Sequence, residues 1–131
     1  MDERITTAGI LVQDGKYLIA KREAKGAIGG LWEFPGGKNR YTEREEETLE
    51  REFMEELSLP VTVGKLVHTH DFINKDTVYH LKAYMVSTDS LDAITLSVHT
   101  EWRLVSLEAL GMYTFAPSDA EIIETLLGLQ G

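Results

Sequence analysis

Residues 31–59 decide the fold of this chain, and they read LWEFPGGKNRYTEREEETLEREFMEELSL. From residue 43 to residue 57 there is neither glycine nor proline, and Leu49, Phe53 and Leu57 recur every four residues. This spacing places the three apolar side chains on one stripe and predicts an amphipathic helix. The helix should end near Ser58, because Pro60 disfavours helical geometry at the residue before it.

Strand patterns surround this helix. They predict strands at 5–12, 16–22, 31–34, 61–71, 77–88 and 93–105, and a second amphipathic helix after Pro117. The dipeptide Asp14-Gly15 predicts a tight hairpin turn, whereas Pro35-Gly36-Gly37 is expected to interrupt regular structure. Strands mixed with two helices indicate a mixed sheet covered by helices, an α/β fold (α+β by some schemes). The length of 131 residues predicts a single domain over 1–131.

Composition excludes several classes of function. The chain has no cysteine, which excludes a disulfide framework, a zinc–thiolate site and a cysteine nucleophile. Its net charge of −9 argues against binding to a nucleic-acid polymer by broad electrostatic attraction. The first residues form neither a signal peptide nor a membrane-spanning segment, so we expect no membrane partner and a cytoplasmic location.

The predicted helix carries a cluster of carboxylates. Glu52, Glu55 and Glu56 stand at positions i, i+3 and i+4, which places them on nearly the same helix face. Like charges at this spacing repel one another by a few tenths of a kcal/mol, and a divalent cation would reverse that penalty. The cluster is therefore either a solvated acidic face or a metal site, and its sequence context bears on the choice.

That context resembles the Nudix box. The spacing runs from Gly37 over five residues to Glu43, then over seven residues to Arg51-Glu52, Phe53, any residue, Glu55-Glu56, any residue and Ser58-Leu59. Each position agrees with the family except Ser58, where the family has glycine. A left-handed residue at a helix end favours glycine by about 1 kcal/mol, so this departure bears on stability or loop path. The resemblance implies a Nudix-type α/β/α sandwich with a mixed central sheet.

The resemblance also implies an activity and its residues. Nudix hydrolases use Mg²⁺ or Mn²⁺ to direct water onto a phosphorus atom of a nucleoside diphosphate linked to another group. Oxygen donors suit either cation. By resemblance, the metal ligands and catalytic residues are Glu52, Glu55 and Glu56, with the backbone carbonyl of Gly37 as a further metal donor. Glu52 is the candidate general base. Glu43 and Arg51 would orient the loop and helix by ion pairing.

One position departs from many members of the family. They have a further glutamate four residues before the position of Trp102, where this chain has Val98. Glu101 would replace that carboxylate after a loop shift, or the carboxylate is absent. The neighbouring His99 is interpreted as a surface residue.

The similarity extends to the MutT-like branch, which hydrolyses nucleoside triphosphates, including 8-oxo-dGTP. It rests on Arg22 ahead of a glycine-rich loop, on residues 31–38, and on Phe115-Ala116-Pro117-Ser118-Asp119. By resemblance, Arg22 and Lys38 contact phosphates, Phe34 lines the base pocket and Asp119 reads the base edge. Each has a plainer alternative: surface charge for the two cations, core packing for Phe34, and the helix dipole for Asp119.

Two histidines stand outside this pattern. His68 and His70 lie on one face of a predicted strand and would bind a metal if a third ligand joined them. Without one in the sequence, they are interpreted as ordinary polar sheet positions.

The leading hypothesis is therefore a hydrolase that converts a nucleoside triphosphate to the monophosphate and pyrophosphate, with oxidised dGTP or a cytidine nucleotide as candidate substrate. By branch similarity, its role would be to sanitise oxidised or non-standard nucleotides such as 8-oxo-dGTP. One alternative is a Nudix hydrolase of a nucleotide sugar or dinucleotide. Another is a Nudix-fold module that senses a nucleotide without turnover. The expected partner is a small nucleotide, and the chain is expected to be a monomer or homodimer.

Overall fold

Alternating side chains along the first two strands build both faces of the sheet. β1 (Asp2–Gln13) buries Ile10 in the core cluster on one face and Leu11 in the cluster on the other. β2 (Lys16–Arg22) does the same with Leu18 and Ile19. The two strands meet as an antiparallel hairpin, as predicted from Asp14-Gly15. Each strand thus supplies apolar side chains to a separate layer on either side.

The computed structural model describes residues 1–24 and 30–130, so part of the glycine-rich loop at 26–30 lies outside the described residues. The remaining elements are β3 (Trp32–Glu33), β4 (Gly36–Lys38), α1 (Glu45–Leu57), β5 (Thr62–Asn74), β6 (Thr77–Ser87), β7 (His99–Val105), a 3-10 helix (Glu108–Met112) and α2 (Pro117–Gln130). None of the helices in this part of the chain is long and apolar enough to cross a membrane.

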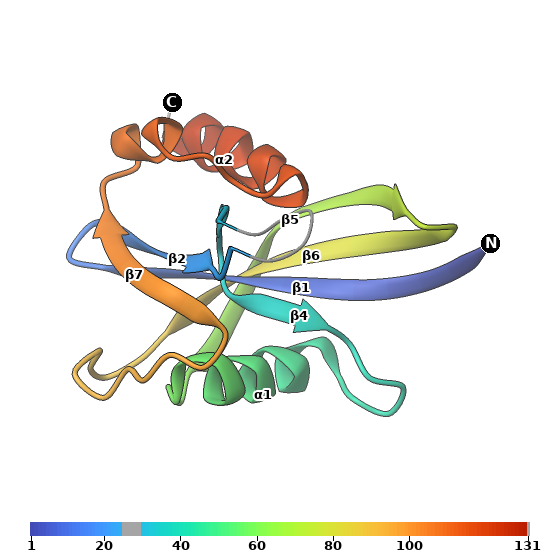
Figure 1. The fold of residues 1–131 in the computed structure, drawn as a ribbon, viewed down its shortest axis with the longest axis horizontal. Helices are drawn as coiled ribbons and strands as arrows, with labels where there is room; N and C mark the ends of the chain where they lie inside the picture. Colours follow the sequence, from blue (N-terminus) through green and yellow to red (C-terminus); the bar gives the residue numbers. More distant parts are fainter. Residues whose placement is uncertain (25–29, 131) are drawn as a thin grey trace.

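The strands form one mixed sheet with helices on both faces. Its order is β3-β2-β1-β6-β5, with β4 paired to β1 and β7 paired to β2. β1 runs parallel to β6, and the other pairs are antiparallel. α1 lies against one face and α2 covers the other (Figure 1). The predicted α/β class with a mixed central sheet is confirmed.

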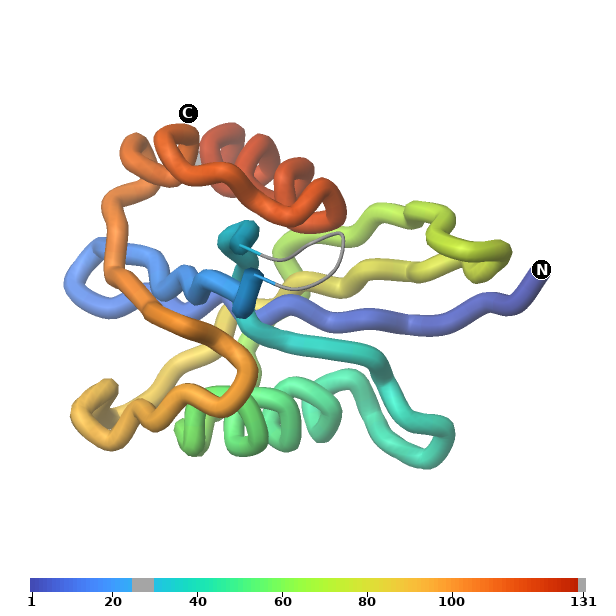
Figure 2. The backbone as a smooth tube through the Cα atoms, in the orientation of Figure 1, coloured from blue at the N-terminus to red at the C-terminus, as the bar shows by residue number. Residues whose placement is uncertain are grey.

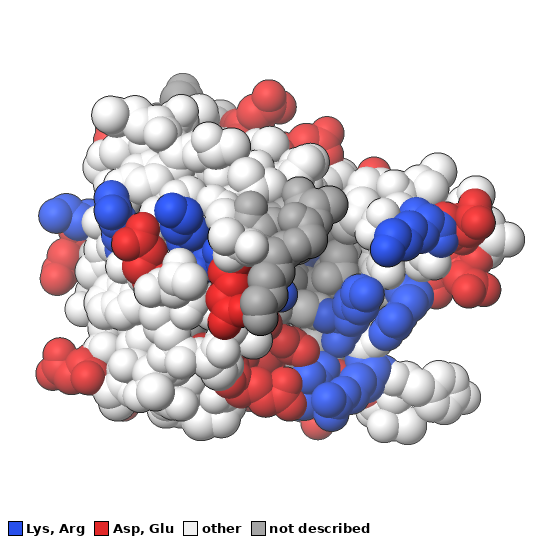
Figure 3. Space-filling view, in the orientation of Figure 1, with Lys and Arg blue, Asp and Glu red and all other residues white. Residues whose placement is uncertain are grey.

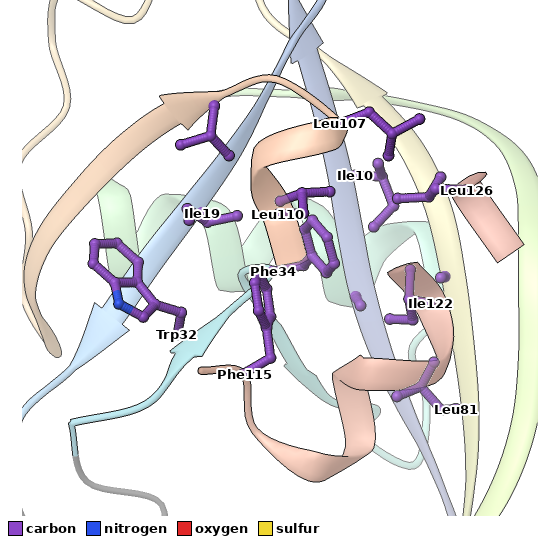
Figure 4. Close-up of a cluster of buried hydrophobic side chains, with 13 residues drawn as sticks. Ile10, Ile19, Trp32, Phe34, Leu81, Leu107, Leu110, Phe115, Ile122 and Leu126 are labelled. Atoms are coloured by element: carbon purple, nitrogen blue, oxygen red, sulfur yellow. The ribbon is translucent and has the colours of Figure 1, made fainter. Parts of the chain in front are cut away.

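Two core clusters hold these layers together. On the α2 face, Phe34 and Phe115 lie ring against ring with their centroids 5.3 Å apart, and Ile122 of α2 packs on the same cluster (Figure 4). On the α1 face, Leu49, Phe53 and Leu57 are fully buried, as their four-residue spacing predicted. Burial of this stripe fixes which face of α1 is left for Glu52 and Glu55.

Two sequence expectations about the strands were wrong. Gly36 and Gly37 do not interrupt regular structure but form β4, because a Cβ at Gly36 would collide with the carbonyl oxygen of Thr7 and glycine avoids that collision. Residues 93–98 are not strand. Their backbone turns to α1 instead, since the N–H groups of Thr95 and Ser97 donate to the carbonyls of Leu57 and Glu56 at 2.9 and 3.1 Å. Figure 2 shows this segment running along the end of α1.

Ser58 ends α1 in the left-handed conformation. Its φ is 53° and its ψ is 36°, and its backbone N–H donates to the carbonyl of Met54 at 3.0 Å. The predicted end of the helix is therefore confirmed. A residue with a Cβ is less stable than glycine in this left-handed conformation, so Ser58 carries a conformational cost that glycine would avoid.

Candidate active site

Arg51 bridges α1 to the loop that precedes it. Its Nε donates to Oε2 of Glu43 at 2.6 Å, and one terminal nitrogen donates to the carbonyl of Lys38 at 3.1 Å. The other terminal nitrogen reaches Glu52 at 2.6 Å and the half-exposed Glu55 at 3.3 Å. The Arg51 hydrogen bond lowers the pKa of Glu43 to about 2. Figure 3 shows acidic side chains over α1 beside basic ones over the β4–α1 loop.

Glu52 lies directly against Gly37 of β4. A Cβ built on Gly37 would stand 2.6 Å from the carboxyl carbon of Glu52, so only glycine leaves room for this carboxylate. The carbonyl of Gly37 accepts a hydrogen bond from the hydroxyl of Thr7 at 2.9 Å. The pleat of β4 and the face of α1 thus bring two predicted metal donors, Glu52 and the Gly37 carbonyl, to one place.

Glu56 is the buried carboxyl of the site. Among the described residues its Oε1 has no hydrogen-bond partner, and the residue is 8% exposed. Burial is the largest cause that raises the pKa of Glu56 far above its usual range, followed by a hydrogen bond to Glu52 and the nearby charge of Glu33. Arg22 acts in the opposite direction. An unpartnered carboxyl oxygen facing other acids is an arrangement that a bound cation would stabilise.

Glu33 and His99 join the site although the sequence analysis gave neither a role there. Oε2 of Glu33 lies 3.1 Å from Arg22 and 2.8 Å from Nε2 of His99. The His99 side chain is fully buried, so its interpretation as a surface residue was wrong. Donor atoms of Glu33, Glu56 and His99 lie within 4.8 Å of one another. The only signal for Glu33 was its place in the strand before the glycine pair.

The segment before β7 reaches the site without a carboxylate. The hydroxyl of Ser97 donates a hydrogen bond to the carbonyl of Glu55 at 2.7 Å, at the C-terminal end of α1. Val98 helps line a hollow of about 320 Å³ together with Arg22. Glu101 is placed elsewhere, because its carboxylate pairs with Arg103 at 3.5 Å, and Arg103 stacks on the Trp32 ring. The structure does not bring Glu101 to Glu52 and Glu56.

Phe34 and Asp119 form a pair across the core. The backbone N–H of Phe34 donates to Oδ2 of Asp119 at 2.8 Å, and both residues are buried. Burial raises the pKa of Asp119 to about 7. Lys38 is separate from this pair, with its ammonium 5.4 Å from the centre of the Tyr79 ring.

Known proteins match this chain over the segment in which the glycine pair of β4 is followed by the glutamate-rich helix α1. Residues 6–125 match the NUDIX domain. The chain belongs to the Nudix family. It is 37% identical to a protein of Escherichia coli (strain K12) named CTP pyrophosphohydrolase, over 94% of this chain and 90% of that protein. It is 43% identical to the 8-oxo-dGTP diphosphatase of Proteus vulgaris, over 50% of this chain and 61% of that protein.

Solved structures agree with this membership. The solution structure of the E. coli ORF135 protein covers 100% of this chain and 93% of its own, with 32% identity and a TM-score of 0.87. The MutT protein from Methanosarcina mazei Go1 has the same fold, with 24% identity, a TM-score of 0.79 and coverage of 98% and 94%. The Nudix-type sandwich expected from residues 37–59 is therefore confirmed, and the protein is a MutT-like Nudix hydrolase.

Proposed function

We propose that this Nudix hydrolase cleaves a nucleoside triphosphate to the monophosphate and pyrophosphate, using Mg²⁺ or Mn²⁺. The observation that carries the proposal is the buried Oε1 of Glu56, which has no partner among the described residues and lies in a group of acids beside Gly37. Among these acids, Glu52 and Glu56 offer only oxygen donors, which suit hard divalent cations. The names of the E. coli and P. vulgaris relatives support CTP and 8-oxo-dGTP as candidate substrates.

Glu52, Glu55, Glu56 and the Gly37 carbonyl would hold the cation. When bound, it supplies positive charge that offsets the negative charge growing on the phosphate oxygens. Arg51 holds Glu52 in place through Oε1, and Glu52 would act as the general base that accepts a proton from the attacking water. The hydrogen bonds of Glu43 fix Arg51 in turn.

Substrate binding would fall to four residues around this centre. Arg22 would contact a phosphate from beside Glu33, and Lys38 would contact one from the rim of the β4–α1 loop. Phe34 and Asp119 would form the wall that meets the base, because their hydrogen bond fixes them as one unit. A carboxyl at this wall can pair with the amino group of cytosine or with the donors of a purine.

A panel of substrates tests the proposal. It contains CTP, dCTP, dGTP, 8-oxo-dGTP, ADP-ribose and a diadenosine polyphosphate, each assayed with Mg²⁺ and with Mn²⁺ for release of pyrophosphate or phosphate. We expect pyrophosphate from one or two triphosphates. Glu56→Gln should lower the rate about a hundredfold or more. Glu50→Gln, at an exposed position on the same helix, is the matched control and should keep the wild-type rate.

Val98 favours one other candidate, a module that binds a nucleotide without turnover, because it stands where many relatives have a carboxylate. Nucleotide binding with no metal-dependent turnover of any substrate would support that candidate and contradict the hydrolase. Turnover of ADP-ribose or the dinucleotide alone would place the protein in another Nudix branch and leave Asp119 without a role in base recognition.

A further inference from the structure

A group of two histidines, a glutamate and a threonine lies between β5 and α2. His68 and His70 stand two residues apart on β5, so both face α2, where Glu121 and Thr125 stand four residues apart on one helix face. α2 covers the opposite face of the sheet from α1, which carries the Nudix carboxylates (Figure 1). This group is therefore separate from the site described above.

The group forms a continuous chain of hydrogen bonds. The Thr125 hydroxyl lies 2.6 Å from Nδ1 of His68, and Nε2 of His68 lies 2.8 Å from Nδ1 of His70. Nε2 of His70 lies 3.0 Å from Oε2 of Glu121. With both rings neutral, Thr125 donates to His68, His68 donates to His70, and His70 donates to Glu121. Every ring nitrogen then has one partner of the right kind.

The surroundings keep these rings available as ligands. Burial and the neighbouring His70 ring lower the pKa of His68, which favours the neutral imidazole that metals bind. The His70 side chain is mostly buried, whereas that of Glu121 is 58% exposed. A cation thus meets two imidazoles held by hydrogen bonds and one exposed carboxylate.

We propose that His68, His70 and Glu121 bind a divalent transition metal, with Zn²⁺ as the simplest probe. One donor atom from each residue lies within 4.8 Å of the others. Donors around a tetrahedral zinc ion lie roughly 3.3 Å apart, so the His68–His70 contact would open slightly and Glu121 would turn inward. The Nδ1–H of His68 would then donate to Thr125, the partner that a metal-bound imidazole needs.

The donor set separates this site from the Nudix site. Imidazole favours Zn²⁺, Cu²⁺ or Ni²⁺, whereas Mg²⁺ prefers oxygen. A metal here would tie α2 to β5, two elements 51 residues apart between His70 and Glu121. The site would therefore stabilise the fold without taking part in hydrolysis.

Nuclear magnetic resonance of the ring nitrogens tests the proposal on the full chain. The protein has four histidines, His68, His70, His80 and His99, so each ring can be followed separately. Zn²⁺ is titrated in the presence of excess Mg²⁺, which under the proposed function would occupy the Nudix carboxylates. We expect the signals of His68 and His70 to finish changing once one equivalent of Zn²⁺ has been added, before the signals of His80 and His99 begin to change. Earlier changes at His99 would instead place the zinc at the Nudix site and overturn the proposal.

Matched variants show whether the ligands are those proposed. Glu121→Gln and His70→Gln should each weaken zinc binding at least about tenfold, measured by calorimetry. His80→Gln is the control, because His80 pairs with two other carboxylates, Glu3 and Asp71, on the same sheet. Zinc should raise the melting temperature of the wild type and His80→Gln more than that of His70→Gln. The Glu121 side chain is exposed, so Glu121→Gln should fold like the wild type. An unchanged zinc affinity in this variant would overturn the proposal.

Discussion

Replacing Asp119 with asparagine should change how the stability of the protein depends on pH. Oδ2 of Asp119 accepts a hydrogen bond from the N–H of Phe34 at 2.8 Å inside the core. Asparagine keeps an oxygen for that bond but cannot ionise. The substitution therefore removes one titration and keeps the bond to Phe34.

The size of the effect follows from burial. Burial is the largest cause that raises the pKa of Asp119 from 3.8 to about 7, and the charge of Glu33 adds to it. The unfolded chain loses this proton near pH 4, whereas the folded protein keeps it until about pH 7. The contribution of Asp119 to stability is thus fully present below pH 4 and is lost as the pH rises through 7. About three pH units at about 1.4 kcal/mol each give a loss of up to about 4 kcal/mol.

Urea unfolding at several pH values from about 4 to 8, without divalent metal, measures this loss. The free energy of unfolding of Asp119→Asn should rise relative to that of the wild type across this range, by up to about 4 kcal/mol. Glu124→Gln removes a charge from an exposed position of the same helix and controls for net charge. A difference between Asp119→Asn and the wild type that stays constant with pH would refute the reasoning.

Four further substitutions test other contacts. Gly37→Ala should lower the hydrolysis rate at least about tenfold with little loss of stability, because its Cβ would push the Glu52 carboxylate aside. Gly36→Ala should instead lower the free energy of unfolding by about 1–3 kcal/mol, because its Cβ would collide with the backbone of Thr7. Hydrolysis rates and urea unfolding of both variants distinguish the two effects. Arg51→Lys should cost about 1–3 kcal/mol in urea unfolding, because lysine cannot make the forked contacts of arginine. Ser58→Gly should stabilise the protein by about 0.5–1 kcal/mol without changing the rate, because φ is positive at this position.

Much of the fold and the centre of the site were predictable from local spacing. The four-residue recurrence of Leu49, Phe53 and Leu57 predicted the buried stripe of α1, and the same helical period predicted that Glu52 and Glu56 project together. These predictions succeeded because both ends of each relation lie on one helix. Helical geometry alone then fixes how the side chains are arranged.

The rest depended on contacts between distant parts of the chain. His99 is buried because Glu33, 66 residues away, accepts its hydrogen bond, and no spacing in the sequence joins the two. His68 and His70 lacked a visible third ligand because Glu121 comes from a helix that packs on β5 only in the folded chain. Pairings of this kind are set by sheet order and helix docking, which a local pattern does not contain.

β4 shows how a local pattern and a distant contact combine in one site. Gly36 and Gly37 are adjacent, and the Cβ positions of adjacent strand residues point in opposite directions. A side chain at Gly36 would meet the backbone of Thr7 in β1, and one at Gly37 would meet the carboxylate of Glu52 in α1. The first contact sets how closely β4 approaches the sheet, and the second sets how closely the helix approaches β4. The glycine pair therefore meets two separate requirements, one of folding and one of chemistry, and substitutions at the two positions should fail in different assays.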